Sequence, residues 1–131
     1  MMNIFVYGTL KPGEGNYQKY CAGKVVEVQK AIVNGKIYAL PMGYPAMTPG
    51  EGKVEGYLLT FPDSSYLRTL DDLEDYQANR RQSKNLYNRH YIEVYNLNGS
   101  SLGFAWVYFM TSEKIYQLGG VMLNGCWTGN N

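Results

Sequence analysis

The stretch Asn3-Ile4-Phe5-Val6-Tyr7-Gly8-Thr9-Leu10 contains the first predicted strand and the start of a glycine-rich turn. Residues 3–7 form an apolar run with the length of a buried strand. The turn contains Gly8, Gly13 and Gly15, which permit positive φ and let successive amides point into one concavity. Such a turn either binds an anion or simply ends the strand. It is not a P-loop, because the required lysine spacing is absent.

Outward from this stretch, the sequence predicts five further strands in a mixed sheet or small barrel. They are residues 25–33, 36–40, 54–61, 87–97 and 102–110. Asn34-Gly35 and Asn98-Gly99 are favoured two-residue turns, so each is expected to close a hairpin. Gly56 lies inside a predicted strand and indicates a bulge or a close backbone contact. No repeat or linker divides the chain, so residues 1–131 are expected to form a single domain.

The remaining segments are predicted to be mostly connections. Residues 17–22 are expected to form one helical turn, and residues 41–52 a loop with three prolines. Residues 77–85 are polar and are expected to form an exposed loop. The segment 111–131 gives no clear assignment, and its role stays open.

One amphipathic helix is predicted near the middle of the chain. Pro62-Asp63-Ser64-Ser65 supplies residues typical of a turn and a helix N-cap. Apolar side chains follow at helical spacing, at Tyr66, Leu67, Leu70 and Leu73. The helix is therefore expected to bury this stripe against the core.

Glu74 is the chemically distinctive residue of this helix. At roughly 100° per residue it falls between Leu70 and Leu67, inside the apolar stripe. Burial disfavours the ionised form and raises the carboxyl pKa, which suits general acid–base catalysis near neutral pH. The alternative is a structural glutamate that pairs with a cation such as Arg89, or with tyrosine hydroxyls.

Two short motifs supply further candidates for a binding site. Tyr87-Asn88-Arg89 can bring a phenol and a guanidinium towards one cleft, or it can be an ordinary strand edge. Tyr44-Pro45-Ala46 can wall a pocket, or it can only stiffen its loop.

Composition narrows the classes of function. The formal charge is +1, so the chain lacks the basic surplus typical of duplex-binding proteins, and no nucleic-acid partner is expected. Two separated cysteines and one histidine argue against a structural zinc site and fit a reducing cytoplasm. The sequence contains no signal-peptide core and no run long enough for a membrane span, so we expect a cytoplasmic protein without a membrane partner.

In order and spacing, these segments resemble the γ-glutamylcyclotransferase-like family, which includes AIG2-like and γ-glutamylamine cyclotransferase proteins. The resemblance covers about residues 3–110. The segments that carry it are Phe5-Val6-Tyr7-Gly8-Thr9-Leu10-Lys11 with Gly13 and Asn16, Gly35, Tyr44-Pro45-Ala46, Val54-Glu55-Gly56-Tyr57, Leu70-Asp71-Asp72-Leu73-Glu74-Asp75-Tyr76 and Tyr87-Asn88-Arg89.

The resemblance implies an α+β fold, a small mixed β-barrel with a few flanking helices and a cavity at one side. It implies that Glu74 is the general acid/base and that Tyr7, Gly8, Thr9 and Leu10 hold a small γ-glutamyl substrate. Tyr44, Tyr87 and Arg89 are the other expected substrate contacts. The reaction would cyclise the γ-glutamyl group to 5-oxoproline and release an amine, without a metal or organic cofactor.

Two departures from the family pattern leave the substrate open. Asp75 stands where family members often have glycine, and the segment between Glu74 and Tyr87 is longer than expected. The alternatives are a non-catalytic small-molecule binding module on the same fold, single-strand nucleic-acid binding, and a related lyase reaction with another leaving group. The sequence identifies neither the leaving amine nor the oligomeric state.

Overall fold

The first strand, β1 (Met2–Val6), is buried on both faces, which explains its continuous apolar sequence. Ile4 and Val6 pack in a hydrophobic cluster that also takes side chains from the helices. Phe5 and the following Tyr7 belong to a second cluster with members from all the longer strands. The strand therefore separates the interior of a barrel from a core beneath the helices.

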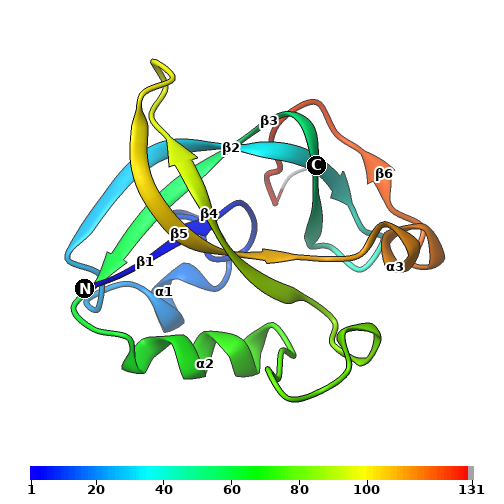
Figure 1. Cartoon of the computed structure of the whole chain (residues 1–131), viewed down its shortest axis with the longest axis horizontal. Coiled ribbons are helices and arrows are strands. Elements are labelled where there is room, and N and C mark those ends of the chain that lie inside the picture. Colours follow the sequence, from blue (N-terminus) through cyan, green and yellow to red (C-terminus); the bar gives the residue numbers. More distant parts are fainter. Residues whose placement is uncertain (130–131) are drawn as a thin grey trace.

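A computed structural model of the chain describes residues 1–129 (Figure 1). The other strands are β2 (Glu27–Ala39), β3 (Pro45–Phe61), β4 (Asn88–Tyr95), β5 (Ser101–Phe109) and β6 (Val121–Met122). The helices are α1 (Tyr17–Tyr20), α2 (Ser65–Leu73) and α3 (Ser112–Gln117), with a 3-10 turn, η1 (Gln82–Lys84). None of the described helices is long and apolar enough to span a membrane.

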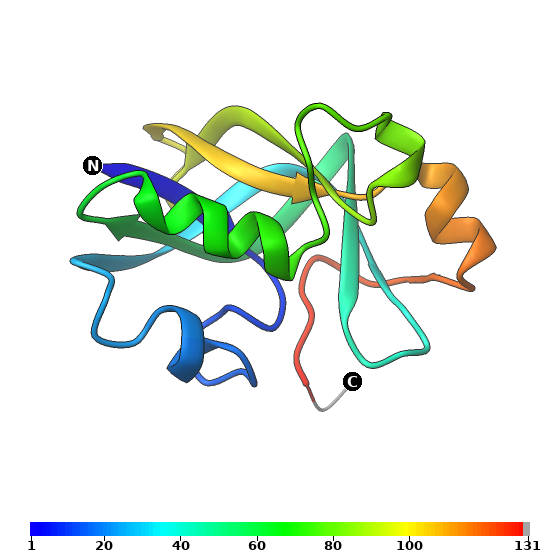
Figure 2. The same ribbon diagram turned by 90° about the horizontal axis from the view of Figure 1, so that it is seen from below.

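Five strands close into a mixed barrel, as the sequence predicts. The order is β3-β1-β5-β4-β2, and a long β2–β3 pairing completes the ring, with β6 attached to the edge of β2. The contact between β1 and β5 is parallel and the other pairings are antiparallel. Helix α2 lies along one side of the barrel, and the view in Figure 2 shows α1 on that side too.

The predicted hairpin at Asn34-Gly35 is wrong. Residues 27–39 form one continuous strand, and both of its halves pair with β3. A Cβ atom at Gly35 would lie 2.9 Å from the carbonyl oxygen of Thr48, so the glycine permits a close approach of β3. Asn34 pairs with Lys53 and Lys36 with Thr48, so residues 49–52 bulge opposite Gly35.

The predicted loop at residues 41–52 is wrong beyond Tyr44. Pro45 begins β3, and Pro49 lies in the bulge. Both are positions where a strand tolerates a residue without an N–H group. Pro45 and Pro49 are therefore compatible with a strand here, since one begins β3 and the other lies in its bulge.

Several other predictions are confirmed. β4 and β5 form the predicted hairpin, and residues 17–20 form a helical turn. The hairpin connection is not the predicted two-residue turn, because the Asn96 amide donates to Ser100 O at 2.8 Å and encloses residues 97–99. Gly56 permits a close backbone contact, because a Cβ there would lie 2.2 Å from the carbonyl oxygen of Val6. The polar loop 77–85 is mostly exposed but ends in the buried Asn85, whose amide donates to Asn88 Oδ1 at 2.8 Å.

Helix α2 begins and ends with defined hydrogen bonds. The Asp63 carboxylate accepts from the Ser65 amide at 2.8 Å, so Asp63 provides the side-chain cap at the N-terminus. At the C-terminus the Tyr76 amide donates to Asp71 O at 2.9 Å and the Asp75 amide to Asp72 O at 3.3 Å. This is the Schellman arrangement, which needs a left-handed residue at Asp75.

Asp75 adopts that left-handed conformation, with φ of 54°. Glycine would adopt it without strain. Here the longer loop supplies Arg80, whose guanidinium donates to the Asp75 carbonyl at 2.7 Å and to its carboxylate at 3.0 Å. Arg80 therefore holds the left-handed residue that follows Glu74.

Candidate active site

A cavity of about 300 Å³ opens between the end of β1, the start of β3 and the C-terminus of α2. Its lining mixes apolar side chains with phenols and one carboxylate. The residues are Phe5, Val6, Tyr7, Gly8, Thr9, Leu10, Asn16, Tyr44, Pro45, Leu73, Glu74, Leu86, Tyr87 and Tyr108. This volume suits a small molecule or one end of a larger one.

Most of the residues predicted from the sequence line this cavity. They are Tyr7, Gly8, Thr9, Leu10, Tyr44, Glu74 and Tyr87. Four separate segments contribute them, because the end of β1, the turn before β3, the end of α2 and the residue before β4 converge there.

Glu74 is the C-cap residue of α2, with its amide bonded to Leu70 O at 3.0 Å. Burial raises the pKa of its carboxyl from 4.5 to about 7. Within residues 1–129 this carboxylate makes no ion pair and no side-chain hydrogen bond, so nothing counteracts the desolvation. A carboxyl in this state can accept or donate a proton near neutral pH.

Three tyrosines in the lining have hydroxyl groups that donate to fixed acceptors. Tyr7 donates to the carbonyl of Tyr108, and Tyr87 to the carbonyl of Pro45 at 2.6 Å. Tyr108 donates to Asp71 Oδ1 at 2.7 Å. Burial raises the pKa of all three phenols, and repulsion from Glu74 raises it further, so they stay neutral. Since each hydroxyl hydrogen is already engaged, each phenol oxygen can offer only a lone pair to a ligand.

The loop from Gly8 to Asn16 follows β1 and carries the other polar groups of the lining. Its shape is fixed by bonds from Lys11 N to Gly8 O at 3.0 Å and from Asn16 N to Thr9 O at 2.8 Å. Within the described residues, the amides of Gly8, Thr9 and Leu10 donate to no other protein group. They are the hydrogen-bond donors available to an anion at this end of the cavity.

The sequence-based reason for glycine in this loop is wrong at two of three positions. Only Gly13 has positive φ, at 89°, whereas Gly8 and Gly15 do not. Gly8 is restricted by space instead, because a Cβ atom would lie 2.7 Å from Pro45 Cγ and 2.9 Å from its Cδ. The glycine lets the loop pack directly against the proline that begins β3.

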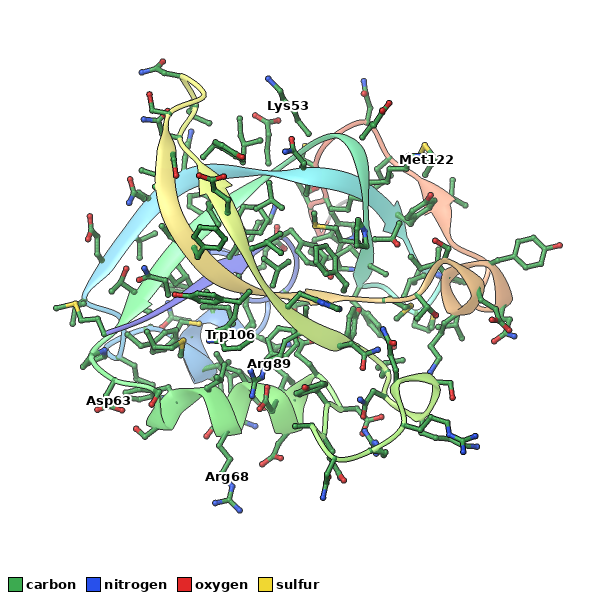
Figure 3. The ribbon with its side chains drawn as sticks, in the orientation of Figure 1. Lys53, Asp63, Arg68, Arg89, Trp106 and Met122 are labelled. Carbon is green, nitrogen blue, oxygen red and sulfur yellow. The ribbon has the colours of Figure 1, made fainter. Side chains whose placement is uncertain are left out.

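Arg89 does not line the cavity with the other predicted residues. Its Nε donates to Asp71 Oδ1 at 2.8 Å, and both side chains are 17% exposed. The guanidinium lies 4.3 Å from the Trp106 ring centroid and 5.0 Å from that of Tyr76 (Figure 3). Arg89 therefore holds the acidic end of α2 against the barrel, and the carboxylate it holds also orients Tyr108.

The sequence interpretation missed Tyr108 as part of the cavity. A two-residue turn at Asn98-Gly99 would place Tyr108 opposite Arg89. The structure has this pairing, but it reaches it through a connection over residues 97–99 and a register shift between Val94 and Tyr95. Other lining residues that were not predicted are Asn16, Leu73 and Leu86. Within residues 1–129, no group of three or more histidine, cysteine or acidic side chains is placed to hold a metal ion.

The chain matches known proteins of one family. A family model described as gamma-glutamyl cyclotransferase, AIG2-like, matches residues 4–129. The chain is 32% identical over 108 residues to the gamma-L-glutamyl-butirosin B gamma-glutamyl cyclotransferase of Niallia circulans, covering 82% of this chain and 67% of that protein.

Solved structures share the fold. An AIG2-like protein of Mus musculus superposes with a TM-score of 0.64 and 25% identity, covering 95% of this chain and 87% of that one. YkqA of Bacillus subtilis gives a TM-score of 0.62 and 23% identity over 84% of this chain, which spans only 36% of YkqA. The chain therefore belongs to the AIG2-like γ-glutamyl cyclotransferase family.

Proposed function

We propose that this protein cyclises the γ-glutamyl group of a γ-glutamyl amine or amide to 5-oxoproline, with Glu74 as general acid/base. The observation that carries the proposal is a desolvated, unpaired carboxyl with a pKa of about 7 in the same cavity as three unengaged backbone amides. Family membership and the name of the Niallia circulans relative support the γ-glutamyl substrate class.

The polarity of the cavity suits the amino-acid end of a γ-glutamyl group. Phenol oxygens and the Glu74 carboxylate can accept hydrogen bonds from an α-ammonium. The amides of Gly8, Thr9 and Leu10 can donate to the α-carboxylate, or to the oxyanion that forms during the reaction. Tyr44 is available to the rest of the substrate, whereas Arg89 acts through Asp71 and is not proposed as a contact.

The reaction needs no nucleophile from the protein. Glu74 removes a proton from the α-ammonium, and the free amine attacks the γ-carbonyl carbon to form a tetrahedral oxyanion. The bond to the leaving nitrogen then breaks while Glu74 returns the proton to it. The attacking nitrogen also gives up its second ammonium proton, which leaves on the departing amine, so the products are 5-oxoproline and the protonated amine. Holding amine and carbonyl together supplies much of the rate, and proton transfer adds typically ~10²–10⁴-fold.

The first test is incubation with a panel of γ-glutamyl amides that differ in the leaving amine. We expect 5-oxoproline, detected by mass spectrometry, from at least one of them in stoichiometric yield with the amine. A spontaneous-cyclisation control without protein is needed, since the reaction is intramolecular. Saturable binding of these amides without any 5-oxoproline would favour the alternative, a non-catalytic binding module on the same fold.

A methyl group at Gly8 is expected to damage binding. In Gly8→Ala the new Cβ would meet the Pro45 ring at 2.7 Å, so the loop or the proline must move. Pro45 also carries the carbonyl that orients Tyr87. Steady-state kinetics should show KM raised by roughly 3–30-fold in a protein that still folds.

Gly15→Ala is the matched control for that variant. Gly15 lies in the same loop, has no positive φ, and would place its Cβ in open space. Its kinetics and melting temperature should equal those of the wild type. If Gly8→Ala behaved like Gly15→Ala, the turn would be only a connection between elements.

A further inference from the structure

The last described residues, 123–129, form a segment that we call the C-terminal strap. It leaves β6 and crosses one end of the barrel. The Leu123 amide donates to Ile37 O of β2 at 2.9 Å, and Gly125 O accepts from the Glu55 amide of β3 at 2.8 Å. The strap is therefore fixed to two barrel strands before it reaches the loop that follows β1.

Trp127 anchors the strap in the barrel interior. Its side chain is 5% exposed and belongs to the hydrophobic cluster that contains Phe5 and Tyr7. Tyr7 also lines the cavity. The strap thus packs against the same cluster that supports the start of the candidate site.

Two polar contacts join the strap to the middle of the loop 8–16. Lys11 is only 8% exposed and is not among the cavity-lining residues, and its ammonium donates to the carbonyl of Trp127. The Gly129 amide donates to Glu14 Oε1 at 3.1 Å. A lysine that is this buried needs its acceptor, since an unpaired ammonium in such a position is costly.

No strand pairing holds the loop itself, because the register of β1 with β3 ends at Val6 and Tyr57. The loop's own hydrogen bonds fix its curvature but not its position relative to the barrel. Among the described contacts of the loop's middle, those from Lys11 and Glu14 reach a segment that is itself tied to the barrel.

We propose that the C-terminal strap positions the loop 8–16, with Lys11, Trp127 and Glu14 as positioning residues that act through the backbone amides of Gly8, Thr9 and Leu10. The functional part of this inference rests on the proposed substrate binding at those amides. Loosening the strap should move the amides relative to Glu74, and so weaken binding more than it slows proton transfer.

The test compares four variants with the wild type. Lys11→Met keeps the apolar stem but removes the donor to Trp127, and Glu14→Ala removes the acceptor for Gly129. Glu14→Gln retains an acceptor oxygen and should restore wild-type behaviour. Lys24→Met is the matched control, since Lys24 lies nearby in sequence but donates to Lys19 O and not to the strap.

Two readouts separate positioning from general stability. Amide hydrogen exchange at Lys11 and Asn16, whose amides bond within the loop, should accelerate by at least ~10-fold in Lys11→Met and Glu14→Ala, with β1 and β3 unchanged. With a γ-glutamyl substrate, KM should rise by about 10-fold while kcat stays within about threefold.

Unchanged exchange at Lys11 and Asn16, with faster exchange at the Gly129 amide, would overturn the proposal, because the strap would then have loosened without affecting the loop. If Lys11→Met fails to fold, the pair Glu14→Ala and Glu14→Gln decides by the same readouts. If the wild type turned over no γ-glutamyl amide, the proposed function would fail, and the exchange comparison would still decide whether the strap holds the loop.

Discussion

Replacing Glu74 by glutamine should lower kcat for the γ-glutamyl substrate by at least ~10²-fold, with little change in KM. Glutamine keeps the shape of the side chain but can neither take the α-ammonium proton nor return one to the leaving amine. Among residues 1–129, no other carboxylate lines the cavity, so no described neighbour can take over the proton transfer. The measurement is 5-oxoproline release under saturating substrate.

Asp72→Asn is the matched control for this loss. Asp72 lies on the same helix two residues earlier, but its side chain is exposed and does not line the cavity. The control should retain wild-type turnover. A Glu74→Gln protein with near-normal kcat on the same substrate would exclude Glu74 as the proton carrier, whatever its pKa.

The position of Glu74 among the cavity-lining residues agrees with helical periodicity. The apolar stripe of Tyr66, Leu67, Leu70 and Leu73 faces the core, while Arg68 and Asp72 point outward. The direction of a side chain in a helix is set by the rotation of about 100° per residue. This rule still gives the direction of the Glu74 side chain, although Glu74 is the C-cap residue of α2.

Periodicity does not predict the contacts of Arg89. Its strand was predicted, but its partner depends on how α2 packs across the hairpin, which is a tertiary contact with no local signal. The Arg89 guanidinium contacts Asp71 and the Trp106 ring. Its positive charge therefore does not pair with Glu74. This arrangement leaves the Glu74 carboxyl unpaired and its pKa high.

The sequence interpretation wrongly divided one strand, β2, and the division has a physical cause. Local turn chemistry at Asn34-Gly35 is real, but pairing with β3 offers two long runs of hydrogen bonds in place of one short hairpin. Gly35 then permits β2 and β3 to lie close together and does not reverse the chain. Short-range signals cannot weigh such long-range pairing, so tertiary structure overrides them.

A second property of Glu74→Gln distinguishes a catalytic carboxyl from a structural one. Burial holds the folded-state pKa of Glu74 at about 7, against 4.5 when it is exposed. Between these values the native state binds more protons than the unfolded state. The free energy of unfolding therefore decreases as pH rises from about 4.5 to 7, and the cost is fully present above pH 7.

Glutamine carries no charge to desolvate, so Glu74→Gln should lose this pH dependence. At about pH 4, below both pKa values of Glu74, the two proteins should have nearly equal free energies of unfolding, measured by denaturant melts. At pH 8 the variant should be more stable than the wild type by about 1 to 3 kcal/mol, while its activity is lost. Gains of stability with loss of function are typical where a site keeps a charge out of water.

The opposite result has an equally definite meaning. If Glu74 were held by a cation, its folded pKa would be depressed, and stability from the pair would be lost as pH falls through that pKa. Removing the carboxylate would then leave a buried positive charge unpaired, which typically costs roughly 3–5 kcal/mol at neutral pH. Marked destabilisation of Glu74→Gln at pH 8 would thus assign the residue a structural role. The unpaired carboxylate at the end of α2 leads us to expect the stabilised variant instead.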